Sequence, residues 1–479
     1  MKLSQLWNVS TALSSTPPST ADFGVPAILV DHADVPLDVR YRTVSKDSYG
    51  TDLTTATDAA SFAATLWGQN FNPALLYVVR WASAATAPMF ICGPSFETTV
   101  ATWAAISDGC FTVTTTAGAD ILTAIDFTGD VTLADVAATI QTKIAAGGSS
   151  GAVCAVDALD RIYFYDGAVT GAGADTVVIT ASGAGTHLEL AAWLDIANGW
   201  AVGGSDIETQ MAAVNAMLAL SDAPYAWFQR GGSTAQVTAL SVGLNALNKI
   251  LVIRESDVTA MTATTNDISY AIHALTHART YGIFTKHTVV NGAAADQNPD
   301  ACFAGEILPR AEGTTSWANM PLAGVSESGL DNDGTTVRAL TDAQRAFLEG
   351  KGCDYLIKPS AVTHARHGLS YGGQEMRVMV ARDWFNYQCM VGFYNYTLAR
   401  PVSTFSDTDL AAYKSVVVNF ADILVGRNCL EAGYTVTMPL ASSFSAAAKA
   451  THTLTISELL NADVTIAIND GVISMNWAA

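Results

Sequence analysis

The 479-residue sequence is poor in charged residues, and the charge that it has is mostly negative. Only 14% of the residues are Asp, Glu, Lys or Arg, and 24 basic residues stand against 44 acidic ones. The formal net charge is −20, and no run of Lys or Arg occurs along the chain. Proteins that hold a phosphate backbone need such basic patches, so we expect no nucleic-acid partner.

Long apolar runs are absent as well. A membrane-spanning helix needs roughly 20 consecutive apolar residues, and no stretch of this sequence approaches that length. The opening MKLSQLWNVSTALSSTPPST also lacks the continuous apolar core of a signal peptide. We therefore expect no direct membrane insertion and no secretion by that route.

Paired cysteine motifs are missing too. The seven cysteines are widely spaced and contain no CxxC pair, so they indicate neither a disulfide framework nor a zinc site. We expect reduced, buried side chains in a chain made in the cytosol. The positions are Cys92, Cys110, Cys154, Cys302, Cys353, Cys389 and Cys429.

Small and apolar residues are abundant instead. Half of the residues are hydrophobic, which excludes a disordered chain, and the length suffices for roughly two to four domains. This apolar surface must be hidden either within the chain or against neighbouring molecules. The composition therefore favours a protein that assembles with other copies.

The order of strand and helix patterns predicts a layered α/β core in two segments, residues 23–97 and 204–380. The first segment holds a strand at Val25–Asp31, a helix capped at Thr57 and a strand at Leu75–Trp81. The second resumes the alternation, with helices after its strands and a capping-box pattern at Thr341 and Gln344. Its strands are expected at Tyr225–Gln229, Ile250–Glu255, from Tyr281, and at Asp354–Lys358.

Residues 98–203 have a different texture and predict an inserted, β-rich α+β outer domain. Short strand patterns such as CFTVTTTA and RIYFYD are separated by glycine-rich turns. One helix is expected where Leu133, Val136, Ile140 and Ile144 recur at helical spacing. Insertion of a domain at a surface loop costs little entropy, so the two core segments can still form one fold.

The chain ends have patterns of their own. Pro17 and Pro18 interrupt regular structure, so residues 1–22 are predicted to form an extended arm. Residues 381–479 are predicted to form an α+β C-terminal domain with two helices followed by alternating strand patterns. These patterns continue through a terminal arm at about residues 460–479, which needs a sheet edge to pair with.

No group of residues has a convincing catalytic pattern. We predict no catalytic, cofactor-binding or metal-binding residue and no cofactor, and we do not expect an enzyme. His273 and His277 lie four apart on a predicted helix, and His364 and His367 flank Arg366, but each pair lacks a third metal ligand. A structural role is favoured for both pairs.

Three further patterns imitate known motifs. Gly147, Ser149 and Gly151 match G-x-S-x-G, but they follow a helix and precede a strand, the reverse of a nucleophile elbow. The DNDG stretch at 331–334 lacks the ligand spacing of an EF-hand and favours an Asx-type turn. The glycines at 171–173 lack the third glycine of a dinucleotide fingerprint and do not follow the first strand of a βαβ unit.

Aromatic residues are concentrated in the first helix of the C-terminal domain. Such a cluster could stack the bases of a single strand, but no basic residues are interleaved with it. A protein core or a subunit interface is therefore favoured. The residues are Trp384, Phe385, Tyr387, Phe393, Tyr394 and Tyr396.

The order of these parts resembles the tail sheath proteins of contractile-tailed bacteriophages, which are related to the sheaths of contractile injection systems. The segments FGVPAILVD, YRTVSKDSYGTDL and TLWGQNFNPALLYVVRW resemble the family's opening pattern, with Gln69, Pro73 and Arg80 at matching places. The stretch DGCFTVTTTAGADILTAIDFTGDVTLADVAATIQTKI resembles a module found in one branch of that family.

The resemblance implies a structural subunit that stacks as hexameric rings around a tail tube and contracts to drive the tube through the host envelope. The C-terminal domain would face the tube, and the arms at 1–22 and 460–479 would donate strands to neighbouring subunits. The implied partners are other sheath subunits, the tail tube protein, and baseplate and tail terminator proteins. The implied location is the virion tail, after assembly in the host cytoplasm.

Two other readings of the sequence stay open at this point. Another phage or secretion-system assembly protein, such as a capsid or tube component, would share the acidity and the lack of active-site motifs. A glycan-binding module or an enzyme is the third reading, with residues 98–203 as its host.

Overall fold

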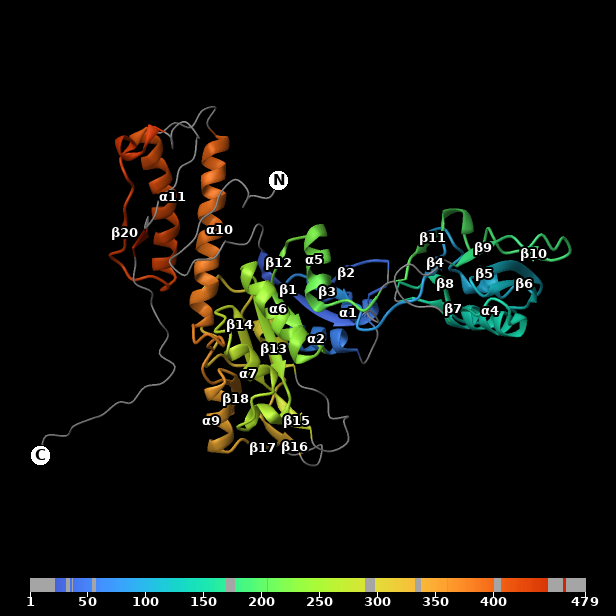
Figure 1. Cartoon of the computed structure of the whole chain (residues 1–479), viewed down its shortest axis with the longest axis horizontal. Helices are drawn as coiled ribbons and strands as arrows, with labels where there is room; N and C mark the ends of the chain where they lie inside the picture. The colour runs from blue at the N-terminus through green and yellow to red at the C-terminus, as the bar shows by residue number, and fades with distance from the viewer. Residues whose placement is uncertain are drawn as a thin grey trace, which may run out of the picture. The chain divides into compact units, whose positions relative to one another are not determined.

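The computed structural model divides the chain into two compact units (Figure 1). The first unit comprises Met1–Ile28, Ser61–Tyr77 and Leu218–Ala479, and the second comprises Leu29–Ala60 and Val78–Met217. The structure describes residues 22–31, 35–36, 38–53, 57–157, 159–168, 177–204, 206–288, 298–331, 337–359, 361–399, 406–446 and 460–461. The predicted arm at 1–22, apart from its last residue, and most of the arm at 460–479 lie outside these residues.

The largest sheet has eight strands in the order β19-β18-β14-β13-β12-β1-β3-β2. The run from β12 to β18 is parallel, and β19 pairs with β18 in the antiparallel sense. The bounds are β1 Asp22–Asp31, β2 Tyr41–Val44, β3 Leu76–Trp81, β12 Pro224–Gln229, β13 Ile250–Glu255, β14 Thr280–Phe284, β18 Asp354–Ile357 and β19 His364–Ala365. This mainly parallel sheet with helical connections confirms the predicted α/β class.

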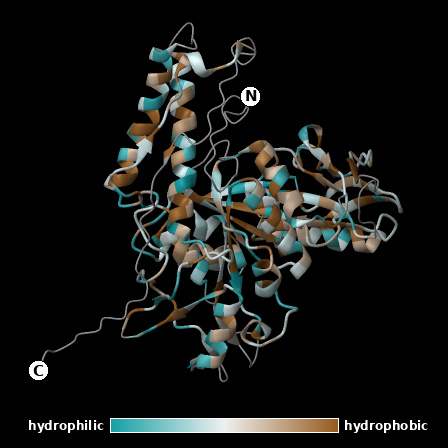
Figure 2. Ribbon diagram, turned by 60° about the vertical axis from the view of Figure 1, so that its left-hand side comes forward, coloured by the Kyte–Doolittle hydropathy of each residue, from teal (hydrophilic) through white to brown (hydrophobic). Residues whose placement is uncertain are grey.

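The central parallel strands are buried along their whole length. All residues of β12 and β14 are buried, and the matching sequences PYAWFQ and TYGIF are almost continuous apolar runs. Such runs are typical of strands in parallel sheets whose two faces are both covered. Figure 2 shows the apolar residues concentrated on these strands. The helices of the first unit's α/β part are α2 Asp58–Trp67, α6 Thr234–Ala246, α7 Ile268–His273, α8 Pro299–Glu306 and α9 Asp342–Gly350. Helix α5 spans Gln210–Leu220, and the division of the sequence into two units falls within it.

Helix starts follow the local sequence closely. The hydroxyl oxygen of Ser233 accepts from Gln236 N–H ahead of α6, and Thr341 and Gln344 form the equivalent box ahead of α9. Both boxes satisfy two backbone donors that would otherwise lack a partner. The predicted capping box at Thr341 is therefore confirmed.

One helix is shorter than predicted. The helical pattern extends to Leu275, but α7 ends at His273. Thr276 then has a φ of 51°, which lies in the left-handed region and cannot continue a right-handed helix. The chain turns there and leads into β14.

The C-terminal part of the first unit is a pair of long helices with a small sheet. Helix α10 spans Met376–Leu398 and α11 spans Asp407–Gly426, where the Ser406 hydroxyl accepts from Asp409 N–H at the start. Strand β20 (Thr435–Val436) pairs antiparallel with β21 (Leu460–Asn461). A separate three-stranded sheet consists of β15 Lys286–Thr288, β16 Gly329–Asp331 and β17 Val337–Ala339.

A buried ionic joint connects α10 to the large sheet. Asp383 of α10 is fully buried, and its carboxylate accepts from Arg279 Nε at 2.7 Å and from Arg279 Nη2 at 2.6 Å. The hydroxyl of Tyr225 on β12 donates to the same carboxylate at 2.8 Å. Because Arg279 directly precedes β14, one carboxylate links a helix to two strands.

The part of the second unit from β4 (Met89–Ile91) to β11 (Trp200–Val202), both strands included, contains two four-stranded sheets. We call this part of the chain the inserted domain. One sheet has the order β11-β4-β8-β7, and in the other β5 pairs with β6, β9 and β10. Helix α3 spans Val100–Trp103 and α4 spans Leu133–Gly147. The remaining strands are β5 Gly109–Thr115, β6 Gly118–Ile125, β7 Ala152–Val156, β8 Ile162–Asp166, β9 Val178–Thr180 and β10 Leu188–Glu189.

The inserted domain has its own hydrophobic core. Side chains from both sheets and from α4 meet there, with Phe111 and Phe164 in edge-to-face contact at 5.6 Å. Val136, Ile140 and Ile144 of α4 are buried in it, as their spacing predicts, and Leu133 is partly buried against it. No helix in the described part of the chain is both long and apolar enough to cross a bilayer.

Removal of the Asp383 carboxylate tests the buried joint. Asp383→Ala leaves the Arg279 guanidinium buried without its counter-charge, so we expect a loss of about 3–5 kcal/mol in the free energy of unfolding. Urea denaturation followed by circular dichroism measures the loss. Asp342→Ala removes a fully exposed carboxylate that pairs with Arg345, and it is the matched control with little expected change. Equal effects of the two substitutions would contradict the assigned importance of the joint.

The buried carboxyl of Glu255 gives a pH test. Burial raises its pKa, although the Ser269 hydroxyl and the Asp257 N–H both donate to it. A carboxyl whose pKa is raised by folding stabilises the protein at low pH, and this contribution is lost as the pH rises through the folded-state pKa. We expect Glu255→Gln to gain stability relative to wild type as the pH rises from about 5 to about 8.

Urea midpoints measured across this pH range give the comparison for Glu255→Gln. Glu431→Gln changes an exposed carboxyl and should follow the wild-type curve. Parallel curves for wild type and Glu255→Gln would refute the assignment of the pH dependence to Glu255.

Candidate assembly surfaces

The sequence candidates for a metal site are separated by the fold. His273 ends α7 and its Nδ1 lies 3.0 Å from the carbonyl oxygen of Tyr371. His277 lies beyond the helix on which it was predicted, because α7 ends early, and its Nδ1 is 2.8 Å from the Ser241 hydroxyl. In the described ranges, no group of three or more His, Cys, Asp or Glu is placed to hold a metal ion.

The second histidine pair has structural contacts. His364 belongs to β19, and His367 Nε2 lies 3.2 Å from a carboxylate oxygen of Glu349. The backbone N–H of His367 donates to Asp354, which also accepts from the Tyr281 hydroxyl. These contacts fix the loop after β19 to the sheet.

The G-x-S-x-G match is the turn between α4 and β7. Gly147 ends the helix, and the peptide N–H groups of Ser149 and Ser150 donate to the carboxylate of Asp120 on β6. The Ser150 hydroxyl donates to the same carboxylate at 2.6 Å. The carboxylate therefore holds the turn, and the order of helix, turn and strand is the reverse of a nucleophile elbow.

The other two motif-like stretches are only partly described. Asp331 ends β16, while residues 332–334 and the glycines at 171–173 lie outside the described residues. All seven cysteines are buried and free of disulfides, as predicted. Burial raises the pKa of the thiols of Cys92, Cys302, Cys353 and Cys389, which makes them poor nucleophiles.

The aromatic cluster of α10 forms much of the contact between the two C-terminal helices. Phe393 and Tyr396 both meet the ring of Tyr413 on α11 edge-on, with centroids 5.5 and 5.0 Å apart. Trp384 meets Phe420 in the same manner at 6.0 Å. The predicted role of this cluster in a core is confirmed for these rings.

The end of α11 is attached to the α/β part of the first unit. The Arg427 guanidinium lies 4.2 Å above the ring of Trp384 and donates to the Glu312 carboxylate at 3.1 Å. Cys429 Sγ approaches the carbonyl oxygen of Gly313 at 3.1 Å. The Asp383 joint fixes the first half of α10, and these contacts fix the end of α11.

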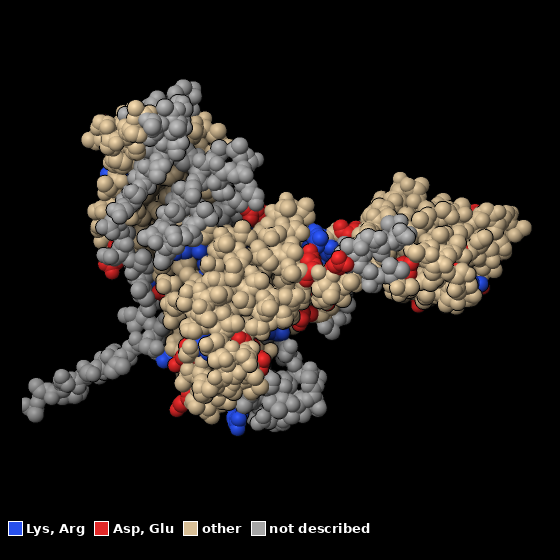
Figure 3. Space-filling view, in the orientation of Figure 1, with Lys and Arg blue, Asp and Glu red and all other residues tan. Residues whose placement is uncertain are grey.

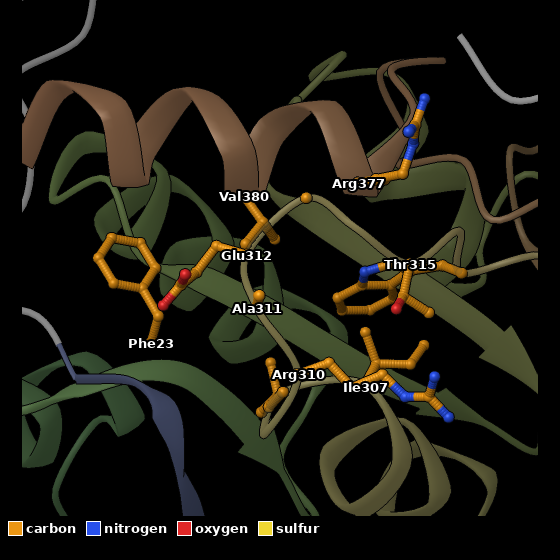
Figure 4. Close-up of a pocket in the computed structure, with 11 residues that line it drawn as sticks. Phe23, Ile307, Arg310, Ala311, Glu312, Thr315, Arg377 and Val380 are labelled. Carbon is orange, nitrogen blue, oxygen red and sulfur yellow. The ribbon is translucent and has the colours of Figure 1, made fainter. Parts of the chain in front are cut away.

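A small pocket lies beside these contacts and has no room for a substrate. Figure 4 shows Val380 of α10 pointing toward Glu312 and Ala311, and Phe23, Arg310 and Arg377 also line the pocket. Its volume is about 20 Å³, enough for a single water molecule. The pocket gives no support to an enzyme with a small-molecule substrate.

The sheet beside α11 consists, in the described residues, of the pair β20 and β21. Each strand has only two residues, and an isolated pair of strands is marginally stable in water. Tyr434 ties the start of β20 to α11 through hydrogen bonds to the Val418 carbonyl at 3.2 Å and to the Asp422 carboxylate at 2.5 Å. These bonds hold the sheet on α11.

The inserted domain has many more acidic than basic residues, but most of its visible surface consists of uncharged residues. Residues 85–206 contain thirteen Asp or Glu and only two basic residues, Lys143 and Arg161. Figure 3 shows uncharged atoms over most of its visible face. Among its described residues, five large apolar side chains are exposed, namely Ile121, Val131, Leu159, Val178 and Leu188.

A comparison with protein families gives one match, which covers the inserted domain. Residues 85–206 fit the family model described as "E217 tail sheath protein gp31, insert domain". The inserted domain is similar to a tail sheath insert domain. The match confirms the resemblance that the sequence indicates for this module, and its bounds extend beyond residues 98–203 at both ends.

The solved structures that the chain matches are remote in sequence. A sheath tail protein of Desulfitobacterium hafniense has 11% identity and a TM-score of 0.44, with 90% of this chain and 92% of that chain covered. A sheath tail protein of Listeria innocua has 9% identity and a TM-score of 0.45, with 91% of each chain covered. A chain of the anti-feeding prophage baseplate has 13% identity and a TM-score of 0.40, with 56% and 72% covered. No curated protein sequence matches the chain.

Sequence inspection missed the ion pairs that position the inserted domain. Arg161 pairs with Asp38, which lies 123 residues earlier in the sequence, and Arg40 pairs with Glu208. The one available signal was the scarcity of basic residues between 85 and 206, which marks Arg161 as unusual.

The separate core of the inserted domain leads to a folding prediction. We expect residues 85–206, expressed alone, to unfold cooperatively in urea. Phe111→Ala in this fragment should cost about 3–5 kcal/mol because it opens a cavity in the core. Ile121→Ala is the matched control on the neighbouring strand, where the side chain is exposed, and should cost less than about 1 kcal/mol. A fragment without a cooperative transition would contradict an independent core.

Proposed function

We propose that this chain is a structural subunit of a contractile tail sheath, which polymerises as stacked hexameric rings around a tail tube. The observation that carries the proposal is the match of residues 85–206 to a tail sheath insert domain. We propose no enzymatic activity, since the function of such a subunit lies in its contacts with other subunits.

The connection between the inserted domain and the rest of the chain supports this proposal. Strands β4 and β11 are antiparallel neighbours, with Met89 opposite Val202 and Ile91 opposite Trp200. The chain therefore enters and leaves the domain on adjacent strands, as a module placed within one loop of another fold does. We propose a discontinuous core at 23–97 and 204–380 with an outward-facing insertion at 98–203.

The small C-terminal sheet supports assembly by strand exchange. A two-residue pair held on α11 by Tyr434 gains stability when further strands add their main-chain hydrogen bonds. We propose that the arms at 1–22 and about 460–479 supply these strands to neighbouring subunits. The C-terminal domain at 381–479 would then face the tube.

Contraction needs no nucleotide in this proposal. The subunits would move as rigid bodies from a metastable packing to a more stable one while the exchanged strands keep them connected. The Asp383 joint suits this role, because it makes the helix pair follow the sheet of its own subunit. The movement would drive the tube through the host envelope.

The proposed partners and location follow from the same role. The partners are neighbouring sheath subunits, the tail tube protein, and baseplate and tail terminator proteins, with no nucleic acid and no direct membrane insertion. The location is the virion tail, after assembly in the host cytoplasm. The low content of basic residues agrees with the absence of a nucleic-acid partner.

Electron microscopy of the purified chain tests the proposal. We expect the full chain to form hollow tubes of one diameter under negative stain, and chains lacking residues 1–21 or 462–479 to remain as single rings or monomers. A chain in which a short Gly/Ser linker replaces residues 85–206 is the matched control and should still form tubes. Closed shells would indicate a capsid protein, and normal tubes from both truncated chains would rule out strand exchange by the arms.

A further inference from the structure

Residues 38–40, just before β2, present two opposite charges to the stem of the inserted domain. Asp38 and Arg40 lie two positions apart, and each meets an oppositely charged partner. Asp38 pairs with Arg161 at the start of β8, and Arg40 pairs with Glu208 in the segment that leads away from the domain. All four residues belong to the second unit.

The pair of Asp38 and Arg161 has the geometry of a strong contact. Nη1 and Nη2 of Arg161 donate to the two carboxylate oxygens of Asp38 at 3.0 and 2.7 Å, which is a bidentate arrangement. Arg161 also donates to Asp157 and lies 5.5 Å from the ring of Trp200. The side chains of Arg161 and Asp38 are only 16% and 9% exposed, so water screens this pair less than a surface pair.

The second pair is tied to the other connecting segment. Arg40 Nη1 donates to Glu208 Oε1 at 2.7 Å. The backbone of Glu208 bonds to the segment that leads into the domain, because Trp81 Nε1 donates to its carbonyl at 2.8 Å and its N–H donates to the Ala82 carbonyl at 3.0 Å. Arg40 therefore binds the point at which the incoming and outgoing segments run side by side.

The reversed polarity of the two pairs fixes one orientation. A shift that brought Asp38 toward Glu208, or Arg40 toward Arg161, would place like charges together and be repelled. Arg161 is also one of only two basic residues between 85 and 206, so the acidic domain has little other means of pairing with Asp38. The arrangement thus selects one register of the stem on residues 38–40.

We propose that residues 38–40 form an ionic latch, which fixes the orientation of the inserted domain relative to β2. The latch can open while the inserted domain and the strands beside β2 stay folded. The domain has a core of its own, and the latch contacts lie outside that core. Opening exchanges the two ion pairs, together with the electrostatic interactions of the buried Arg80 with Asp38, Arg40 and Glu208, for solvent or for charges on another surface. The inference concerns a single chain and does not rest on the proposed sheath function.

Spin labels in the full chain test the latch. Thr43 on β2 and Thr180 on β9 are exposed, and all native cysteines are buried, so Thr43→Cys and Thr180→Cys accept labels selectively. Electron–electron double resonance on labelled chains diluted with unlabelled ones measures the distance within one chain. We expect a single narrow distribution at low salt, which broadens by about twofold or more in about 1 M sodium chloride.

Asp38→Asn is the decisive variant, because both hydrogen bonds described for the Asp38 carboxylate come from Arg161, while Arg80 also interacts with it electrostatically. We expect it to broaden the distribution as salt does, while the melting temperature stays unchanged. Glu208→Gln should act in the same direction through the second pair. The double variant Asp38→Asn/Arg161→Gln should be no broader than Asp38→Asn, because both substitutions break one contact.

Lys143→Gln is the matched control for a charge change in the inserted domain. Lys143 lies on α4 and carries the only other basic charge of the domain. We expect its distance distribution to equal that of the wild type. Narrow distributions for Asp38→Asn and Glu208→Gln at low salt would overturn the latch, and so would equal broadening by Lys143→Gln.

Discussion

The buried carboxylate of Asp383 is the contact on which the arrangement of the first unit depends. A charge without solvent exposure is tolerated only while its partners remain in place, and here the partners come from β12 and from the start of β14. Helix α10 cannot slide along the sheet without breaking the two hydrogen bonds between Arg279 and Asp383. The aromatic contacts with α11 then extend this fixed position to the second helix.

Much of the fold could be predicted because its signals are local. A capping box needs two residues three apart, as at Ser233 and Thr341, and a buried parallel strand is a short apolar run, as at Tyr225–Gln229. The change of texture between the core and the inserted domain was also visible in the sequence. The early end of α7 could not be predicted. Thr276 adopts a left-handed conformation in the folded chain, and no glycine at this position indicates such a conformation in the sequence.

The contacts that position the parts could not be predicted, because they join residues far apart in the sequence. Arg279 and Asp383 are separated by 104 positions, and Asp38 and Arg161 by 123. Any of the acidic residues could have been the partner of either arginine until the topology brought two of them together. The assembly role of the terminal strand patterns stays a prediction, whereas the role of Tyr434 in holding β20 on α11 could not be predicted because it depends on the packing of the helix.

The pairing of β4 with β11 has a consequence for how such a chain can be modified. Because neighbouring strands are about 4.8 Å apart, the two connections to the inserted domain meet the rest of the chain almost at one point. Any folded unit whose own termini lie equally close could occupy this position without stretching the surrounding backbone. The position between β4 and β11 is therefore suited to the insertion of another folded domain, such as a fluorescent reporter or a binding module.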